Sequence, residues 1–286
     1  MRGTYSVNPS FSQKLKKGAG IGAACAAAVG VQLFLIAPGG VTKRQKAPFY
    51  GRSFAHRGLH AEDKSVPENS LEAFRLAAAA GYGVELDVQL TKDGQVVVFH
   101  DDTLTRVCGV NARVDEKTWN ELRLLRLCGT EQRIPLLTEA LAVIRGKGPL
   151  IVELKNGRRN RELCEKTYAI LSDYEGQVCI ESFNPMIVRW FRFHARDLVR
   201  GQLATTVKDY GDSTSKPTAF LLSRCLLNFL SRPQFIAYRV GWRPLPVHLS
   251  EALGAMRFGW TVRNERHERR RDAVIFEFYR PPLKIK

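Results

Sequence analysis

The chain has 286 residues, of which 44% are hydrophobic and 25% are charged, and its net charge is +16 at neutral pH. This length suits one large barrel or two small domains, and the composition excludes an intrinsically disordered protein. Seven positive charges precede residue 48, where Asp and Glu are absent, so the rest of the chain carries +9. The sequence lacks zinc-finger spacing and any basic stripe interleaved with aromatic residues, so nucleic acid is not an expected partner. The basic excess fits phosphate-bearing substrates or anionic lipid headgroups, although a solvated basic surface is the commoner explanation.

The first distinctive stretch, residues 18–37, contains twenty residues with Gln32 as the only strongly polar one. That is about the length of a membrane-spanning helix, and we interpret it as an uncleaved membrane anchor. A cleaved signal peptide and a segment that does not span the membrane are the alternatives. Basic residues on the two sides nearly balance, which leaves the orientation undecided. Six cysteines without a CxxC pattern favour a reduced compartment, so the cytoplasmic side is preferred for the barrel.

From Pro48 onward the chain alternates between strand-like and helix-like patterns, so we expect a basic anchoring segment at 1–47 and one domain at 48–286. A helix is expected to begin after Pro67, with Asn69 as its N-cap and Glu72 completing a capping box. Residues 101–135 read as a decorated loop. Eight strand-like segments, mostly separated by helical ones, predict a (β/α)₈ TIM barrel. These segments are 52–57, the unit starting at 84, 150–154, 178–183, 199–204, 235–240, 258–262 and 273–277.

Val84 to Asp101, VELDVQLTKDGQVVVFHD, is the most informative stretch of the chain. Glu85 and Asp87 lie two residues apart on a predicted strand, so both carboxylates project from the same face. A Lys-Asp-Gly turn leads into a second strand that ends at His100. Two carboxylates and an imidazole in one short unit are the components of a divalent-metal site with an acid/base partner, although a half-buried strand with exposed acids would show the same pattern.

In a barrel, the carboxyl ends of the strands meet at one mouth. Glu153 would then add a third carboxylate, and three carboxylates suit Mg²⁺ or Ca²⁺ better than zinc. Arg57 and Lys155 would be placed to hold a phosphate. His56 and His100 carry the side chain best suited to proton transfer near neutral pH.

These residues occur within HRG, PEN, ELD, TKDG and FHD, in that order with normal gaps, and the stretch from Phe54 to Lys155 resembles the glycerophosphodiester phosphodiesterase family. The resemblance implies a TIM barrel that hydrolyses glycerophosphodiesters to an alcohol and glycerol 3-phosphate with one divalent cation, Mg²⁺ or Ca²⁺. The residues that match the family's site are the metal ligands Glu85, Asp87 and Glu153, the catalytic histidines His56 and His100, and the substrate-binding residues Arg57, Lys155 and Trp260.

The ending of the last strand, DAVIFEFYRP, departs from the family's usual acidic residue before proline, and the region 208–241 contains no recognisable motif. The second of these regions is expected to shape the specificity for the alcohol. Ser182, Phe183 and Trp260 have packing as their commoner role, and we interpret His60 and His194 as surface residues. Asn69 is as well explained by a helix cap as by a phosphate contact.

The implied mechanism is metal-assisted hydrolysis, with one histidine as base and the other as acid. A cyclic phosphate intermediate and direct hydrolysis both remain open. Two alternatives remain as well. One is a lysophospholipase D-like enzyme that acts on membrane lysolipids, and the other is a silent barrel that only binds phosphodiester headgroups.

Overall fold

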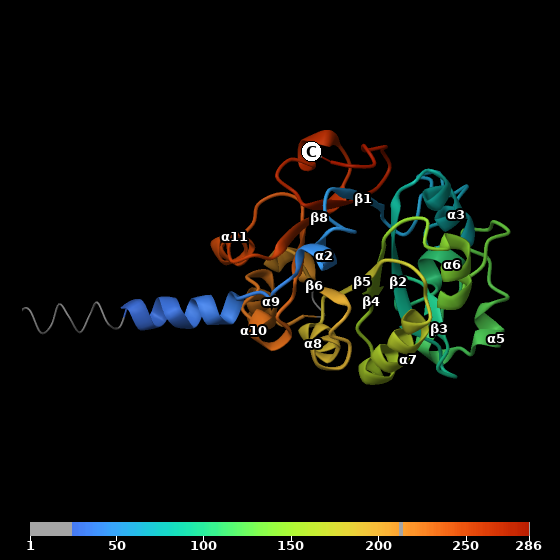
Figure 1. Ribbon diagram of the computed structural model, residues 1–286. Coiled ribbons are helices and arrows are strands. Elements are labelled where there is room, and N and C mark those ends of the chain that lie inside the picture. The colour runs from blue at the N-terminus through green and yellow to red at the C-terminus, as the bar shows by residue number, and fades with distance from the viewer. Residues whose placement is uncertain (1–24, 212–213, 286) are drawn as a thin grey trace, which may run out of the picture.

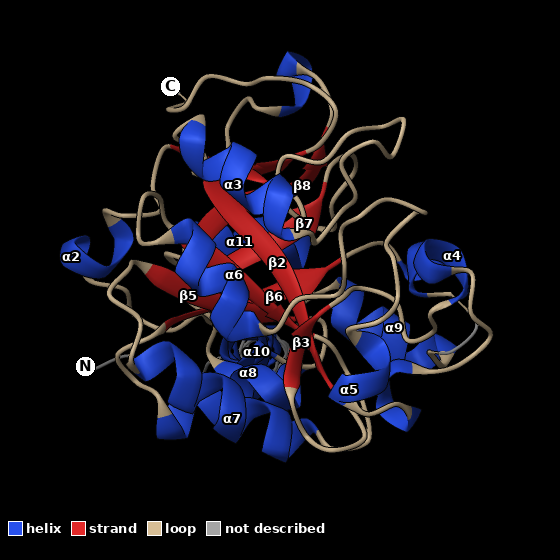
Figure 2. Cartoon of the chain, turned by 90° about the vertical axis from the view of Figure 1, so that its right-hand side faces the viewer, coloured by secondary structure: helices blue, strands red, loops and turns tan. Residues whose placement is uncertain are grey.

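The computed structural model describes residues 25–211 and 214–285 of the chain. Eight parallel strands pair in series, and the first of them pairs with both the second and the last, so the sheet closes into a barrel. Helices surround these strands (Figure 2). The predicted TIM barrel is thus confirmed. Its strands are β1 (Arg52–Ala55), β2 (Gly83–Leu90), β4 (Leu150–Leu154), β5 (Val178–Ser182), β6 (Val199–Ala204), β7 (Phe235–Arg239), β8 (Met256–Val262) and β9 (Ala273–Phe276).

Helices follow most of the barrel strands in the expected alternation. The segment between β6 and β7 contains two helical pieces, α9 (Lys216–Ser223) and α10 (Asn228–Ser231), separated by a turn. The segment between β8 and β9 holds only a 3₁₀ turn, η3 (Glu265–His267). The main helices are α3 (Leu71–Ala79), α6 (Leu137–Ile144), α7 (Asn160–Ser172), α8 (Pro185–His194), α9 (Lys216–Ser223), α10 (Asn228–Ser231) and α11 (Leu245–Ala252).

A long excursion leaves the barrel after β2. β3 (Val96–Val98) turns back antiparallel to β2, as the Lys-Asp-Gly turn predicted. The predicted decorated loop then contains α4 (Thr105–Cys108), η1 (Val114–Glu116) and α5 (Trp119–Leu122), which surround a small apolar cluster of their own. This cluster anchors the loop, and the loop brings His100 and its neighbours to the mouth of the barrel.

The inner face of the barrel has an apolar layer farther from the carboxyl ends of the strands, here called the lower layer. It contains Phe54, Ile151, Cys179, Phe235 and Phe258. Outward-facing residues of the same strands pack instead against the helices. Because side chains alternate between the two faces of a strand, the residues two positions further along also point inward. Their layer lies nearer the carboxyl ends, and it contains the predicted site residues His56, Glu153 and Trp260.

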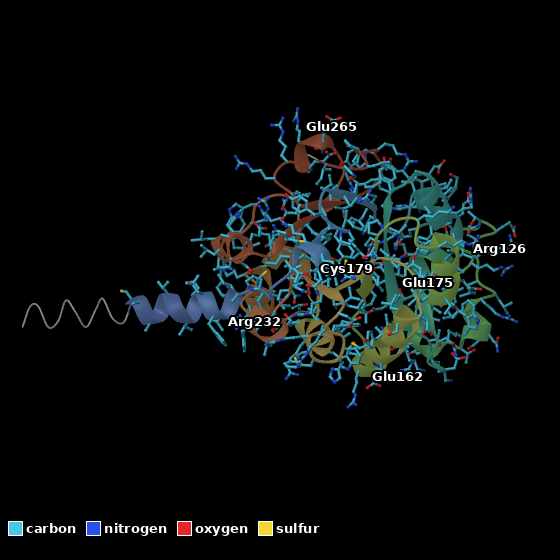
Figure 3. All side chains as sticks on the ribbon, in the orientation of Figure 1. Arg126, Glu162, Glu175, Cys179, Arg232 and Glu265 are labelled. Carbon is cyan, nitrogen blue, oxygen red and sulfur yellow. The ribbon has the colours of Figure 1, made fainter. Side chains whose placement is uncertain are left out.

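An N-terminal helix, described for residues 25–36, projects from the barrel beside α9 and α10 (Figure 1). Its end is fixed to the domain: the carbonyl of Ile36 accepts a hydrogen bond from Ser250 Oγ at 2.8 Å, and Arg232 Nη1 donates to the carbonyl of Ala37 at 2.9 Å. Arg232 lies at this junction (Figure 3). Phe49, in the segment that follows α2 (Lys43–Lys46), packs against the lower layer of the barrel.

The predicted membrane span at 18–37 falls partly outside the described residues, because residues 18–24 are not among them. Among the residues that the structure describes, no helix is both long enough and apolar enough to span a bilayer. The anchor and the domain boundary after residue 47 remain predictions.

Candidate active site

Three carboxylates meet at the inner mouth of the barrel. Glu85 and Asp87 project from β2, and Asp87 lies opposite Glu153 in the register between β2 and β4. All three side chains are buried, and one oxygen of each lies within 4.8 Å of the corresponding oxygens of the other two. The structure therefore brings together the three residues that were predicted as metal ligands.

The charges in this cluster are only partly balanced. Burial raises the pKa of Glu85 well above its usual value, and the charges of Asp87 and Glu153 raise it further. Burial also opposes ionisation of Asp87, but the charges of His100, Lys155 and Arg57 together hold its pKa well below its usual value. Lys155 Nζ lies 2.8 Å from Glu153 Oε1 and 3.5 Å from Asp87 Oδ1. The Lys155 ammonium is thus shared between the Asp87 and Glu153 carboxylates.

The donor set fits a hard divalent cation, since carboxylate oxygens are the ligands that Mg²⁺ and Ca²⁺ prefer. Asp87 Oδ1 is buried without a hydrogen-bond partner among the described residues, and Glu85 is repelled by both neighbouring acids. A bound cation would give Asp87 Oδ1 a partner and would reduce the repulsion between Glu85 and the neighbouring acids.

The turn after β1 brings the backbone into this site. Gly58 has a φ of +80°, and a Cβ at this position would lie 2.8 Å from Ala73 of α3, so only glycine fits there. This close approach places the backbone N–H of Arg57 2.8 Å from Glu85 Oε2. The Arg57 guanidinium then reaches Asp87, with Nε 3.4 Å from Oδ2.

Asn69 is a site residue and not the predicted helix cap. The N-cap of α3 is Ser70, whose Oγ accepts a hydrogen bond from the Ala73 N–H. Asn69 has a φ of +54°, a conformation that Asn adopts more readily than most residues. Its Nδ2 donates to Asp87 Oδ2 at 2.8 Å, so the amide orients a predicted metal ligand.

Glu277, which follows the last barrel strand, contacts residues that follow the first strand, at the other side of the mouth. Its Oε1 lies 3.2 Å from both His56 Nδ1 and His60 Nε2, and Arg263 Nε donates to its Oε2 at 3.0 Å. Burial lowers the pKa of His56 to about 4, helped by the Arg57 charge and opposed by the Glu277 carboxylate. The imidazole is therefore neutral near pH 7.

One interpretation of the sequence needs correction in this region, and one residue was missed. The His60 side chain is 7% exposed and shares the Glu277 carboxylate, so it is not a surface residue. Glu277 was not among the predicted site residues. The signal for it was an acidic residue at the inward-facing end of a strand, the same signal that identified Glu85 and Asp87. His194, by contrast, is exposed as predicted.

His100 is held by a separate chain of ionic contacts. Its Nδ1 lies 2.6 Å from Asp101 Oδ1, and Asp101 Oδ2 accepts a hydrogen bond from Arg106 Nε at 2.6 Å. Arg106 also binds Glu68, which in turn binds Arg57 at 2.7 Å. The two predicted histidines are thus oriented by different carboxylates, and Arg57 belongs to both the metal site and this network.

Two cavities open at the mouth, and Trp260 lines both of them. One, of about 400 Å³, contains His56, Arg57, His60 and Glu277. The other, of about 930 Å³, contains Glu153 and Lys155 together with an apolar wall made of Phe183, Leu222, Leu227 and Trp260. Phe183 and Trp260 therefore line a cavity, whereas Ser182 Oγ donates to the Leu154 carbonyl and has a packing role.

Comparisons with known proteins agree with this geometry. A solved phosphodiesterase of Oleispira antarctica in complex with the product sn-glycerol-3-phosphate has a TM-score of 0.66 at 23% identity, covering 81% of this chain and 94% of that one, which establishes the fold. The glycerophosphodiester phosphodiesterase of Caldanaerobacter subterraneus subsp. tengcongensis is 38% identical over 148 residues, which are 47% of this chain and 59% of that protein. The rat lysophospholipase D GDPD1 is 30% identical over 210 residues, 68% of this chain and 59% of that protein. The aligned parts thus cover less than two thirds of either curated relative.

A sequence profile of the glycerophosphoryl diester phosphodiesterase family matches residues 56–277, and the chain belongs to that family.

Proposed function

We propose that this protein is a metal-dependent hydrolase that cleaves small glycerophosphodiesters to an alcohol and glycerol 3-phosphate. The observation that carries this proposal is the convergence of three buried carboxylates, two separately oriented histidines and two cationic side chains at one mouth. A silent binding barrel would not need two imidazoles, each held by its own carboxylate, so the arrangement favours catalysis.

Each residue has a distinct task in this proposal. Glu85, Asp87 and Glu153 would hold one divalent cation, Mg²⁺ or Ca²⁺, which when bound supplies Lewis-acid stabilisation of the phosphoryl charge. Arg57 and Lys155 would bind the phosphate oxygens as point charges and hydrogen-bond donors.

The two histidines would divide the proton transfers between them. His56 is neutral near pH 7, so it would accept a proton from the nucleophile, either a water molecule or a substrate hydroxyl, and Glu277 would hold its other ring nitrogen. His100, oriented by Asp101, would give a proton to the departing alcohol. Trp260 would form the side of the substrate pocket.

The direct test is a screen of the full chain against glycerophosphocholine, glycerophosphoethanolamine and glycerophosphoglycerol, with enzymatic detection of glycerol 3-phosphate. We expect turnover that is abolished by chelation and restored by Mg²⁺ or Ca²⁺, and abolished in Asp87→Asn. Binding of these diesters without any product would support the silent barrel and overturn the proposal. Detection of a cyclic phosphate by ³¹P NMR would decide the route.

A second candidate is lysophospholipase D-like hydrolysis of membrane lysolipids. The larger cavity supports it, because its apolar wall of Phe183, Leu222, Leu227 and Trp260 could take an acyl chain. Release of choline from lysophosphatidylcholine, compared with glycerophosphocholine at equal concentration, tests this candidate. We expect Leu222→Asp to reduce turnover of the lysolipid much more than turnover of the small diester.

We further propose that residues 18–37 attach the protein to a membrane, with the barrel on the cytoplasmic side. Within the described helix, Val29, Val31 and Phe34 are each more than half exposed, which is costly in water and favourable in lipid. The full chain should then stay with membranes after a high-salt wash, because an apolar span is not released by screening of charges. Recovery in the washed soluble fraction would overturn the proposal of an anchor, without affecting the proposal of an enzyme.

A further inference from the structure

Glu181 is a fourth acid beside the three predicted metal ligands. It lies on β5, opposite Glu153 in the register between β4 and β5, just as Glu153 lies opposite Asp87 between β2 and β4. Residues that face one another across parallel strands point to the same side of the sheet. Asp87, Glu153 and Glu181 therefore form one inward-facing row across three neighbouring strands.

Hydrogen bonding to the described residues does not explain the burial of Glu181. It is 1% exposed, and its Oε2 has no hydrogen-bond partner among the described residues. The cation nearest the row, Lys155, donates its hydrogen bond to Glu153. Two positions earlier on the same strand, Cys179 lies in the apolar lower layer. A buried carboxyl without a partner is destabilising, so a purely structural role would be better filled by an apolar residue.

Glu181 lies outside the inner ligand set, and the strand register places it next to that set. Oxygens of Glu85, Asp87 and Glu153 lie mutually within 4.8 Å, the separation expected for ligands of one ion, and Glu181 is not part of this group. Its partner in the register, Glu153, belongs to that group, so Glu181 lies beside the cation site. A carboxylate in this position can reach an ion through one intervening water molecule. Mg²⁺ in particular keeps several of its waters when it binds to proteins.

We propose that Glu181 is an outer residue of the divalent-cation site, which accepts a hydrogen bond from a water on the ion and so strengthens the binding of the ion. This inference rests on the cation site of the proposed function. It assigns Glu181 a positioning role and no contact with the substrate. It also explains why an acid is placed where an apolar residue would make the metal-free protein more stable.

The test is Mg²⁺ binding to the full chain, measured by isothermal titration calorimetry after chelation and dialysis. Outer-shell partners of a metal site commonly contribute about 10- to 100-fold in affinity, so Glu181→Gln should weaken Mg²⁺ binding by that factor. Glu181→Asp, which keeps the charge but withdraws it by one methylene, should give a smaller loss. The metal-free Glu181→Gln protein should melt no lower than the wild type, because Glu181 Oε2 has no hydrogen-bond partner to lose among the described residues.

Glu251→Gln is the matched control, since the Glu251 side chain, on α11, is only 6% exposed but pairs with Arg243, away from the site. It should leave Mg²⁺ affinity unchanged. A folded Glu181→Gln protein that binds Mg²⁺ within twofold of the wild type would overturn the role of Glu181 and leave the cation site standing. Absence of Mg²⁺ binding to the wild type, with Ca²⁺ also failing to bind, would overturn the cation site itself, and the role of Glu181 with it.

Discussion

Replacement of Glu277 by glutamine tests whether this carboxylate serves catalysis through His56. Glutamine keeps the shape of the side chain and removes its charge. One oxygen of Glu277 lies 3.2 Å from His56 Nδ1, and the other binds Arg263. If Glu277 accepts the Nδ1 proton, the Nε2 lone pair of His56 is left free to take a proton from the nucleophile.

The size of the effect follows from the length of this contact. A separation of 3.2 Å is longer than a charge-assisted hydrogen bond, so we assign it the ordinary net value of about 0.5–1.5 kcal/mol. With about 1.4 kcal/mol for each factor of ten in rate, kcat/KM should fall about 2- to 12-fold in Glu277→Gln. The Arg263 pair adds little to this, because the Arg263 side chain is 62% exposed. Glu277→Ala should lose more, since His56, His60 and Arg263 would all lack an acceptor.

The pH dependence separates this role from a structural one. The Glu277 carboxylate raises the pKa of His56 against the larger lowering by burial, so its removal should move that pKa below the present value of about 4. If His56 is the base, the acidic limb of the kcat/KM profile should move to lower pH in Glu277→Gln. Histidine side-chain NMR of the metal-free protein measures the same shift without catalysis.

Glu268→Gln is the control, because Glu268 accepts a hydrogen bond from Tyr279 in the same region and contacts neither histidine. It should leave both the rate and the profile unchanged. If Glu277→Gln keeps wild-type kcat/KM and an unshifted titration of His56, then the proposed orientation of His56 is wrong.

Three further predictions concern the remaining groups. Glu85→Gln, Asp87→Asn and Glu153→Gln should each remove most activity while the protein stays folded by circular dichroism; full turnover of the wild type in EDTA after exhaustive dialysis would contradict the metal site. His100→Ala should lower the rate by about 10²- to 10⁴-fold, the usual contribution of a general acid or base, and near-normal kinetics would make His100 a bystander. The pKa of His56 is about 4 in the folded state and 6.5 when unperturbed, so the unfolded chain binds more protons between these pH values. The free energy of unfolding should therefore fall by about 3 kcal/mol as the pH drops from 6.5 to 4. Urea denaturation at pH 7 and pH 4.5 checks this, and a His56→Gln protein with the same pH dependence would refute it.

The sequence alone was enough for the barrel and for the acidic centre of the site. Strand periodicity is a local property, because covalent geometry turns residues i and i+2 to one face wherever a strand forms. The shared face of Glu85 and Asp87 could therefore be predicted, and so could the position of Glu153 at the end of a later strand. Eight strand-like segments with intervening helices then allowed few arrangements other than a closed parallel sheet.

The local signals were weakest where one residue type serves two purposes. Asn69 and Ser70 are both good helix caps, and the sequence favoured Asn69 because Glu72 follows it at capping-box spacing. The structure assigns the cap to Ser70 and turns Asn69 toward Asp87. The choice depends on where β2 lies relative to α3, and this information is absent from the local pattern.

Only the tertiary structure decided the surroundings of the histidines and the row that contains Glu181. His56 and Glu277 are separated by 221 positions in the chain, and they meet because β1 pairs with β9 when the barrel closes. The register between β4 and β5 likewise sets Glu181 beside Glu153. Strand periodicity tells which face a side chain takes, but the identity of its neighbour depends on the register between strands, and a shift of one residue would turn these acids away from the site.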